Sequence, residues 1–189
     1  MKQTTYDQLL EAAMNVIRRE GFDKASVSRF VKEAGVAQGT FYNYFASKNE
    51  LVPAIAARIL DEQLARMKER GDAETLEMLM DTMIDVTFTI TEEFRDYISF
   101  CYSGISLYYS FERWDEIYRP YYVWLESQFL RLQQAGSITT ELELKAAVNN
   151  MVGLIEHAAE AHYLSRAVTE DRTTAEAELK RMLVRALTT

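Results

Sequence analysis

Apolar side chains recur every three or four positions along most of the chain, which is typical of helices with one buried face. In the first third, this pattern predicts helices over residues 5–20, 27–34, 37–44 and 48–70. The last of them follows Ser47–Glu50, a sequence that fits a helix capping box. The N-terminal part is therefore expected to be three small helices followed by a longer one.

The rest of the chain continues the helical pattern, and no segment shows the alternation of a half-buried strand. Residues 110–120 are ambiguous, because Pro120 must either begin a helix or kink one. Capping boxes are expected before the last two helices, at Thr140–Glu143 and Thr173–Glu176. The sequence predicts an all-α protein of about nine helices. The later five are expected over residues 72–93, 94–110, 120–134, 141–165 and 173–187.

Composition agrees with a soluble, mainly helical protein. The chain has 189 residues, of which 48% are apolar and 26% charged, with only two prolines and seven glycines. Its single cysteine, Cys101, excludes an intramolecular disulfide and a cysteine-based zinc site. No signal-peptide pattern opens the chain, and no apolar run reaches the roughly 18 residues that span a bilayer. We therefore expect a cytoplasmic protein without a membrane partner.

The net charge of −8 argues against nucleic-acid binding when it is averaged over the chain. The average hides an asymmetry, since residues 24–48 carry four basic side chains against Glu33 as the single acidic one. This segment therefore differs electrostatically from the acidic remainder.

The basic segment contains a specific motif. Two short helices joined by Gly35 and packed on a third predict a helix-turn-helix. Residues 34–51, A-G-V-A-Q-G-T-F-Y-N-Y-F-A-S-K-N-E-L, together with G-F-D-K-A-S-V at 21–27, closely resemble the DNA-binding head of the TetR family of bacterial transcriptional regulators. The resemblance implies a DNA-binding domain over 1–47 and an effector-binding and dimerisation domain over 48–189, connected through helix 48–70.

The outward side chains of helix 37–44 suit DNA. Gln38 and Asn43 can pair with adenine, and the missing side chain of Gly39 lets the backbone approach closely. Tyrosines and lysine suit phosphate oxygens. On a short helix without the motif, such residues are more often a solvated face. The predicted DNA contacts are Ser28, Arg29, Gln38, Gly39, Thr40, Tyr42, Asn43, Tyr44 and Lys48.

Fourteen of the 22 aromatic residues lie between Phe88 and Phe129, too many for one helix stripe. Ordinary core packing is one explanation, and an apolar cavity with a few tyrosine hydroxyls is the other. The resemblance implies an effector pocket here, for a hydrophobic or aromatic small molecule. The candidate ligand contacts are Met83, Phe88, Phe100, Tyr108, Trp114, Tyr118, Tyr121, Tyr122, Leu125, Val152 and Ile155.

The helix expected over 141–165 is apolar nearly all round, so it needs neighbours on two sides. Together with the last helix it is expected to form a four-helix interface in a homodimer, as in the family. Such a dimer implies a pseudo-palindromic operator. The candidate interface residues are Val148, Met151, Ile155, Ala158, Ala159, His162, Leu179, Met182, Leu183 and Leu187.

Other chemistry has little support. His157 and His162 are five apart, whereas a helical metal site favours a spacing of four, so no metal and no cofactor is expected. No phosphate-binding glycine loop or nucleophile motif indicates an enzyme. The function expected is a ligand-responsive repressor, released from double-stranded DNA by its effector. The alternative is a helical small-molecule-binding protein without sequence-specific DNA binding.

Overall fold

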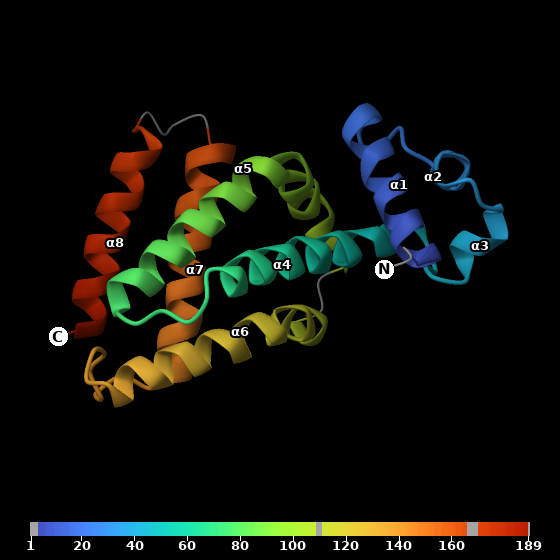
Figure 1. Ribbon diagram of the computed structural model, residues 1–189. Coiled ribbons are helices and arrows are strands. Elements are labelled where there is room, and N and C mark those ends of the chain that lie inside the picture. The colour runs from blue at the N-terminus through green and yellow to red at the C-terminus, as the bar shows by residue number, and fades with distance from the viewer. Residues whose placement is uncertain (1–3, 109–110, 166–169, 189) are drawn as a thin grey trace. The chain divides into compact units, whose positions relative to one another are not determined.

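A computed structural model describes residues 4–108, 111–165 and 170–188, although no side chain between 103 and 111 is described. Throughout these residues the secondary structure is helical, with eight α-helices and one 3-10 turn, which confirms the all-α prediction (Figure 1). The elements are α1 Thr5–Glu20, α2 Val27–Ala34, α3 Gln38–Tyr42, η1 Lys48–Glu50, α4 Leu51–Glu69, α5 Leu76–Tyr108, α6 Phe111–Gln134, α7 Leu144–Leu164 and α8 Arg172–Thr188.

The helix count is one below the expected nine because two predicted helices are one. Residues 72–93 and 94–110 were expected to be separate, but α5 runs unbroken from Leu76 to Tyr108. Neither glycine nor proline occurs between Asp72 and Phe100, so nothing in the sequence stops the helix. Two predicted helices of moderate length thus form one of 33 residues.

The first helix is capped at Thr4, whereas the capping box predicted at Ser47 does not form. At α1 the Thr4 hydroxyl accepts from the backbone N–H of Asp7 and the capping box is complete. The box expected at Ser47 is wrong, since Ser47 makes no side-chain cap bond and a 3-10 turn follows it. Glu50, which would have completed the box, instead accepts from Arg113 of α6 at 2.6 Å.

Acidic residues begin the last two helices in place of the predicted threonines. The Glu143 carboxylate accepts from the backbone N–H groups of Lys145 and Ala146 at the start of α7. The Asp171 carboxylate accepts from the backbone N–H of Thr174 at the start of α8. A carboxylate there also complements the positive end of the helix dipole.

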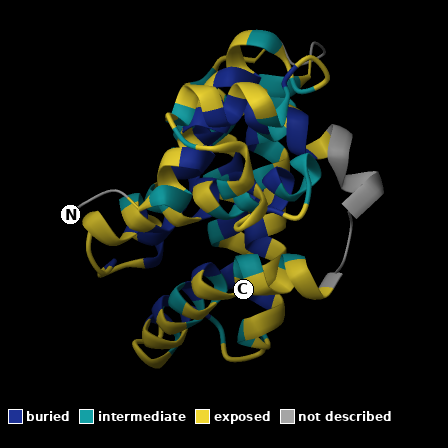
Figure 2. Cartoon of the chain, turned by 90° about the vertical axis from the view of Figure 1, so that its right-hand side faces the viewer, coloured by how far each residue is buried: buried dark blue, intermediate teal, exposed yellow. Residues whose placement is uncertain are grey.

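The chain forms two compact units, residues 1–58 with 96–117 and residues 59–95 with 118–189. Each helix has a buried side and an exposed side (Figure 2). Apolar side chains form both cores. Those of the first unit include Leu9, Ala13, Val16, Phe30, Phe41 and Leu51, and those of the second Met67, Met80, Phe88, Leu125, Phe129, Val148 and Leu183. Helices α4, α5 and α6 contribute residues to both units. Among the described residues, no helix is long and apolar enough to cross a bilayer.

Candidate nucleic-acid interface and buried polar cluster

The helix-turn-helix is held by aromatic packing. Phe41 of α3 is fully buried, with its ring 6.1 Å from that of Phe30 and 5.1 Å from that of Phe45. The turn between α2 and α3 passes through Gly35, whose φ of 69° is left-handed and favours glycine. Helices of eight and five residues are too short to be stable alone, so packing determines where α3 lies.

The opposite side of α3 is open. Gln38, Gly39 and Tyr42 are exposed on the helix, and Asn43 and Tyr44 are exposed in the turn that follows it. Tyr42 and Tyr44 retain 53% and 47% of their accessible surface, which is unusual for large aromatic residues. Of the predicted contacts on this element, Thr40 alone is half-buried. The structure thus places these side chains on one accessible surface.

Gly39 is not required by packing within the protein. A Cβ atom built on it would have no atom within 4 Å, and its φ is not in the left-handed region. A glycine inside a helix costs about 0.5–1 kcal/mol relative to alanine. Gly39 therefore makes α3 less stable than alanine would, although no other part of the chain fills the space beside it.

The cationic residues of the predicted DNA contacts have partners within the head. The Lys48 Nζ donates to the carbonyl oxygens of Phe22 and Ala25, at 2.7 and 3.0 Å, and lies 4.0 Å from the centre of the Phe22 ring. Arg29 forms an ion pair with Glu20 and is half-exposed. Lys48 thus ties the α1–α2 connection to the start of η1, and its contact with phosphate stays a prediction.

The first unit also includes the end of α5. The Tyr97 hydroxyl donates to the carbonyl oxygen of Met14 at 3.1 Å and accepts from Arg18 Nε at 3.0 Å. The rings of Phe22 and Phe100 lie 4.4 Å apart. These contacts attach α1 to the part of α5 within the same unit.

A second polar region lies inside the other unit. The Gln63 amide of α4 donates to the hydroxyls of Thr87 on α5 and Tyr121 on α6, at 3.2 and 3.1 Å, and all three residues are buried. The Tyr118 hydroxyl donates to the Glu156 carboxylate of α7 at 3.1 Å. We call this set, with the neighbouring Tyr122, the Glu156 cluster. Its members are Gln63, Thr87, Tyr118, Tyr121, Tyr122 and Glu156.

The environment of the Glu156 cluster disfavours charge. Burial raises the pKa of Glu156 to about 8, an effect opposed by the hydrogen bond from Tyr118 and reinforced by the Glu160 carboxylate. Burial likewise raises the pKa of Tyr118 well above its usual range. Both side chains nevertheless keep some accessible surface. Around neutral pH, much of the Glu156 population therefore holds a proton.

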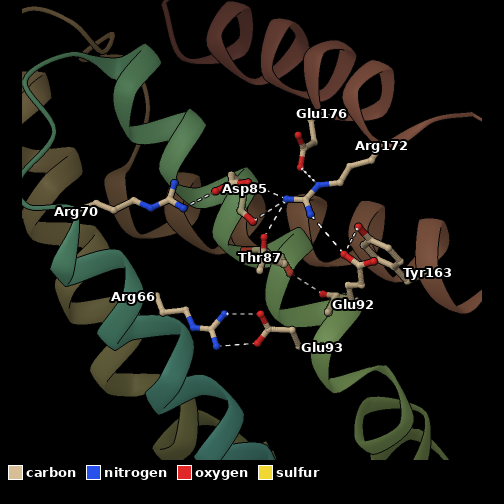
Figure 3. Close-up of polar contacts among 11 residues, drawn as sticks. Arg66, Arg70, Asp85, Thr87, Glu92, Glu93, Tyr163, Arg172 and Glu176 are labelled. Atoms are coloured by element: carbon tan, nitrogen blue, oxygen red, sulfur yellow. Dashed lines mark hydrogen bonds and ion pairs between the residues drawn. The ribbon is translucent and has the colours of Figure 1, made fainter.

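A network of ion pairs joins the helices of the same unit. Arg66 of α4 donates to both carboxylate oxygens of Glu93, at 3.0 and 2.7 Å (Figure 3). It also donates to Glu62 at 2.9 Å. Arg172 of α8 donates to Asp85 at 2.8 Å and to Glu176 at 2.7 Å. The network ties α4 and α8 to α5.

An open cleft of about 390 Å³ lies beside this network, between α5 and α8. Its charged lining is already paired: Lys180 contacts Asp81 at 2.7 Å, and Arg70 pairs with Asp85. These pairs leave little unsatisfied charge for a ligand to meet, so the cleft gives no reason to place an effector there.

Two family sequence models match the chain. The model described as bacterial regulatory proteins, tetR family, covers residues 9–55, and the one described as tetracyclin repressor-like, C-terminal domain, covers residues 80–187. An uncharacterised HTH-type transcriptional regulator of Bacillus subtilis, YvdT, is 42% identical over all of this chain and 98% of its own length. The chain belongs to the TetR family of bacterial transcriptional regulators.

Solved structures of the TetR family share this fold. A FadR regulator from Bacillus subtilis, in complex with stearoyl-CoA, superposes with a TM-score of 0.75 at 22% identity, over 96% of this chain and 99% of that one. Thermus thermophilus FadR, a TetR-family repressor in complex with lauroyl-CoA, gives 0.72 at 18% identity, over 94% and 92%. The all-helical architecture is therefore that of the family.

The predicted ligand contacts divide between the two units. Met83, Phe88, Tyr121, Leu125, Val152 and Ile155 are buried in the second unit, where Tyr118 and Tyr122 are half-buried. Phe100, which is buried, and Trp114, which is half-buried, belong to the first unit. Tyr108 is helical, but its side chain lies outside the described residues. The second unit thus brings together eight of the eleven candidates.

Most of the predicted dimer contacts are covered within a single chain. Helices α7 and α8 pack against each other. The predicted contacts that are buried are Val148, Met151, Ile155, Ala159, Leu179, Leu183 and Leu187. Ala158 and His162 are half-buried. Met182 is exposed by 49%, and Leu154, which was not predicted, by 43%. Both helices therefore keep some exposed apolar surface within a single chain.

Three members of the Glu156 cluster, Gln63, Thr87 and Glu156, were not among the predicted ligand contacts. Gln63 and Thr87 lie on the buried faces of α4 and α5, which are otherwise mainly apolar, and a polar residue at such a position is the signal that could have found them. Glu156 stood out in the sequence only as a neighbour of the two histidines. Among the described residues, no three His, Cys, Asp or Glu side chains are grouped as a metal site would require.

Proposed function

We propose that this TetR-family chain acts as a homodimeric, cytoplasmic repressor that binds a pseudo-palindromic operator through α3 and leaves it when a hydrophobic small molecule binds. The accessible surface of α3 carries the proposal. Its amide, hydroxyl and phenol groups can read base edges and phosphates, and the basic segment around it favours DNA despite the acidic remainder.

The proposal is tested with double-stranded DNA from upstream of the chain's own coding sequence. We expect a mobility shift whose affinity falls steeply between roughly 50 and 200 mM salt, because phosphate contacts release counterions. Gln38→Ala should reduce discrimination at one base position by about 1–3 kcal/mol. A protein that binds small molecules but shifts no DNA would be the alternative, a ligand-binding helical protein.

Gly39→Ala gives a sharper test, because the glycine has no packing role within the chain. The variant should be more stable by about 0.5–1 kcal/mol, since alanine favours the helix, while its operator affinity falls. Stability and binding then move in opposite directions. Unchanged operator affinity would show that the α3 backbone does not approach DNA closely.

A second copy of the chain is the partner proposed for α7 and α8. Leu154 and Met182 leave apolar surface exposed on these two helices, and a two-fold operator requires two heads. The predicted dimer contacts that are buried within one chain would then form the core beneath this surface. Ala158 and His162 would lie at the edge of the surface.

Matched substitutions test the dimer. Leu154→Glu and Met182→Glu should give monomers by sedimentation and weaken operator binding, because a charge replaces apolar contact surface. Leu130→Glu and Met78→Glu serve as controls, since these residues are exposed to similar extents, 45% and 48%, on α6 and α5. Equal behaviour of the two pairs would place the dimer surface elsewhere.

The effector is proposed to act through helices that belong to both compact units. Residues 1–47 would form the DNA-binding domain and residues 48–189 the effector domain, with α4 as the connector. Because α4 supplies residues to both units, a shift that starts at its Gln63 end can reach the head. A ligand changes DNA binding only by its difference in affinity for the two states. A regulator of this kind needs no enzymatic step.

A further inference from the structure

The feature that the family assignment does not explain is a carboxylate without a positive partner. Within the described residues, Glu156 accepts one hydrogen bond, from Tyr118 at 3.1 Å, and takes part in no ion pair. The acidic side chain that acts on it electrostatically is Glu160, one turn further along α7, which adds repulsion. A desolvated carboxylate is costly unless a positive charge compensates it.

The groups that face Glu156 come from the helices packed around it. Tyr118 and Tyr121 of α6 interact with it, and the ring of Tyr122 stacks 6.2 Å from that of Tyr121. Behind them, the Gln63 amide and the Thr87 hydroxyl, which do not ionise, hold the Tyr121 hydroxyl. None of these groups is basic.

The aromatic part of the cluster supplies ring faces beside the carboxylate. The rings of Tyr118 and Tyr122 stack with centroids 5.4 Å apart, next to the carboxylate that Tyr118 contacts. An aromatic face attracts an ammonium group placed over it, more strongly where water is excluded. Tyr118, Tyr122 and Glu156 all keep accessible surface, so a small molecule can reach them.

We propose that the Glu156 cluster binds the positively charged group of a lipophilic organic cation, such as a quaternary ammonium or phosphonium compound, which is the effector of this regulator. This inference rests on the proposed function and narrows the effector to one charge class. The carboxylate supplies the counter-charge, and the tyrosine rings supply apolar and cation–π contact. An anionic ligand such as an acyl-CoA would place negative charge beside two glutamates.

The test compares ions of similar shape and opposite charge on the full-length protein. Tetraethylammonium, benzyltrimethylammonium and tetraphenylphosphonium are titrated calorimetrically, with tetraphenylborate and stearoyl-CoA as the anions. At least one cation should bind, and it should bind about ten-fold or more tightly than either anion. Because its charge is permanent, its affinity should rise steeply between pH 6 and pH 9, by up to about ninety-fold, as Glu156 loses its proton.

Substitutions distinguish binding at the Glu156 cluster from nonspecific attraction of cations to the acidic protein. Glu156→Gln should abolish both the preference for cations and the dependence on pH, whereas Glu77→Gln, at an exposed position of α5, should change neither. Tyr122→Leu removes one ring and keeps the carboxylate, so it should weaken cation binding several-fold while retaining the pH dependence. If Glu156→Gln unfolds, Tyr122→Leu and the pH profile of the unmodified protein decide the question.

The outcomes distinguish the two proposals. Absence of binding by every cation up to about 1 mM, equal binding of tetraphenylborate, or a pH-independent affinity would overturn the cation site. Release of the operator by stearoyl-CoA and not by the cations would do the same, while leaving the repressor intact. Failure to shift operator DNA in the absence of any ligand would contradict the proposed function instead.

Discussion

The surface of α3 and the Glu156 cluster are both polar, but they are polar for opposite physical reasons. On α3, side chains such as Gln38 and Tyr42 lie in solvent, where polarity costs little free energy, and they are accessible to the DNA that we propose they contact. In the cluster, Gln63, Thr87 and Glu156 are polar in a desolvated place, where each group must find a partner. The polar side chains of α3 are accessible to solvent, whereas those of the Glu156 cluster are packed among helices of the second unit.

The comparison shows where polar residues inform most about function. An exposed polar residue is common, so the α3 surface gained its meaning from the motif around it. A desolvated polar residue is rare, so Glu156 is informative on its own. Substitutions in the two regions should therefore affect stability and binding differently.

The largest effect is expected at the support of α3. Phe41→Ala empties a fully buried position and should lower the free energy of unfolding by about 3–5 kcal/mol. Tyr42→Ala, one position along, should change it by less than about 0.5 kcal/mol, yet weaken binding to all DNA sequences. Urea unfolding and mobility shifts measure the two quantities. Similar stability of the two variants would contradict the division of α3 into a buried and an exposed side.

The Glu156 cluster should make stability depend on pH. The unfolded carboxyl has a pKa near 4.3, whereas burial holds the folded value at about 8. Between these values the folded state binds more protons than the unfolded state, so stability is greatest below the lower value and falls as the pH rises. The loss between pH 5 and pH 8 should be on the order of 2 kcal/mol, allowing for partial exposure.

Glu156→Gln should remove that loss and Glu77→Gln should preserve it. Thermal or urea unfolding at several pH values makes the measurement. An identical pH profile for the unmodified protein and Glu156→Gln would mean that the carboxyl is not desolvated, and it would erase the contrast with α3.

Lys48 sharpens the comparison because it belongs to the head but is bonded internally. Lys48→Ala leaves two carbonyl oxygens without their donor and should lower the free energy of unfolding by about 1–2 kcal/mol. Lys32→Ala, at an exposed position of α2, should stay within about 0.5 kcal/mol. Comparable stability of both variants would mean that the hydrogen bonds of Lys48 to the two carbonyl oxygens do not stabilise the head.

The smallest effect is expected in the ion-pair network of the second unit. Arg172→Met should lower the free energy of unfolding by about 1 kcal/mol, because its partners on α5 and α8 are partly solvent-screened. Arg181→Met removes an exposed pair within α8 and should have an effect below about 0.5 kcal/mol. A larger loss of stability for Arg181→Met than for Arg172→Met would mean that the contacts of Arg172 with several partners do not make it the more stabilising residue.

Local patterns predicted much of the head. The spacing of apolar residues gave α1 and α2 within a residue, and Gly35 indicated the turn, because these features depend on residues close in sequence. The same reasoning was wrong about the capping box at Ser47, since it did not include the competing contact that Arg113 makes with Glu50, 63 positions away in sequence. It was also wrong to divide α5, where an expected boundary had no breaker residue behind it.

The sequence by itself determined the helical class and the helix-turn-helix, and it predicted which side chains of α3 are candidates for DNA contact, because periodicity and short motifs are local. The tertiary structure decided which polar residues are desolvated together and which apolar residues of α7 and α8 remain exposed. Both depend on helices that are distant in sequence: Gln63, Thr87, Tyr121 and Glu156 come from four different helices. Burial is a property of that packing, so no single helix pattern contains it.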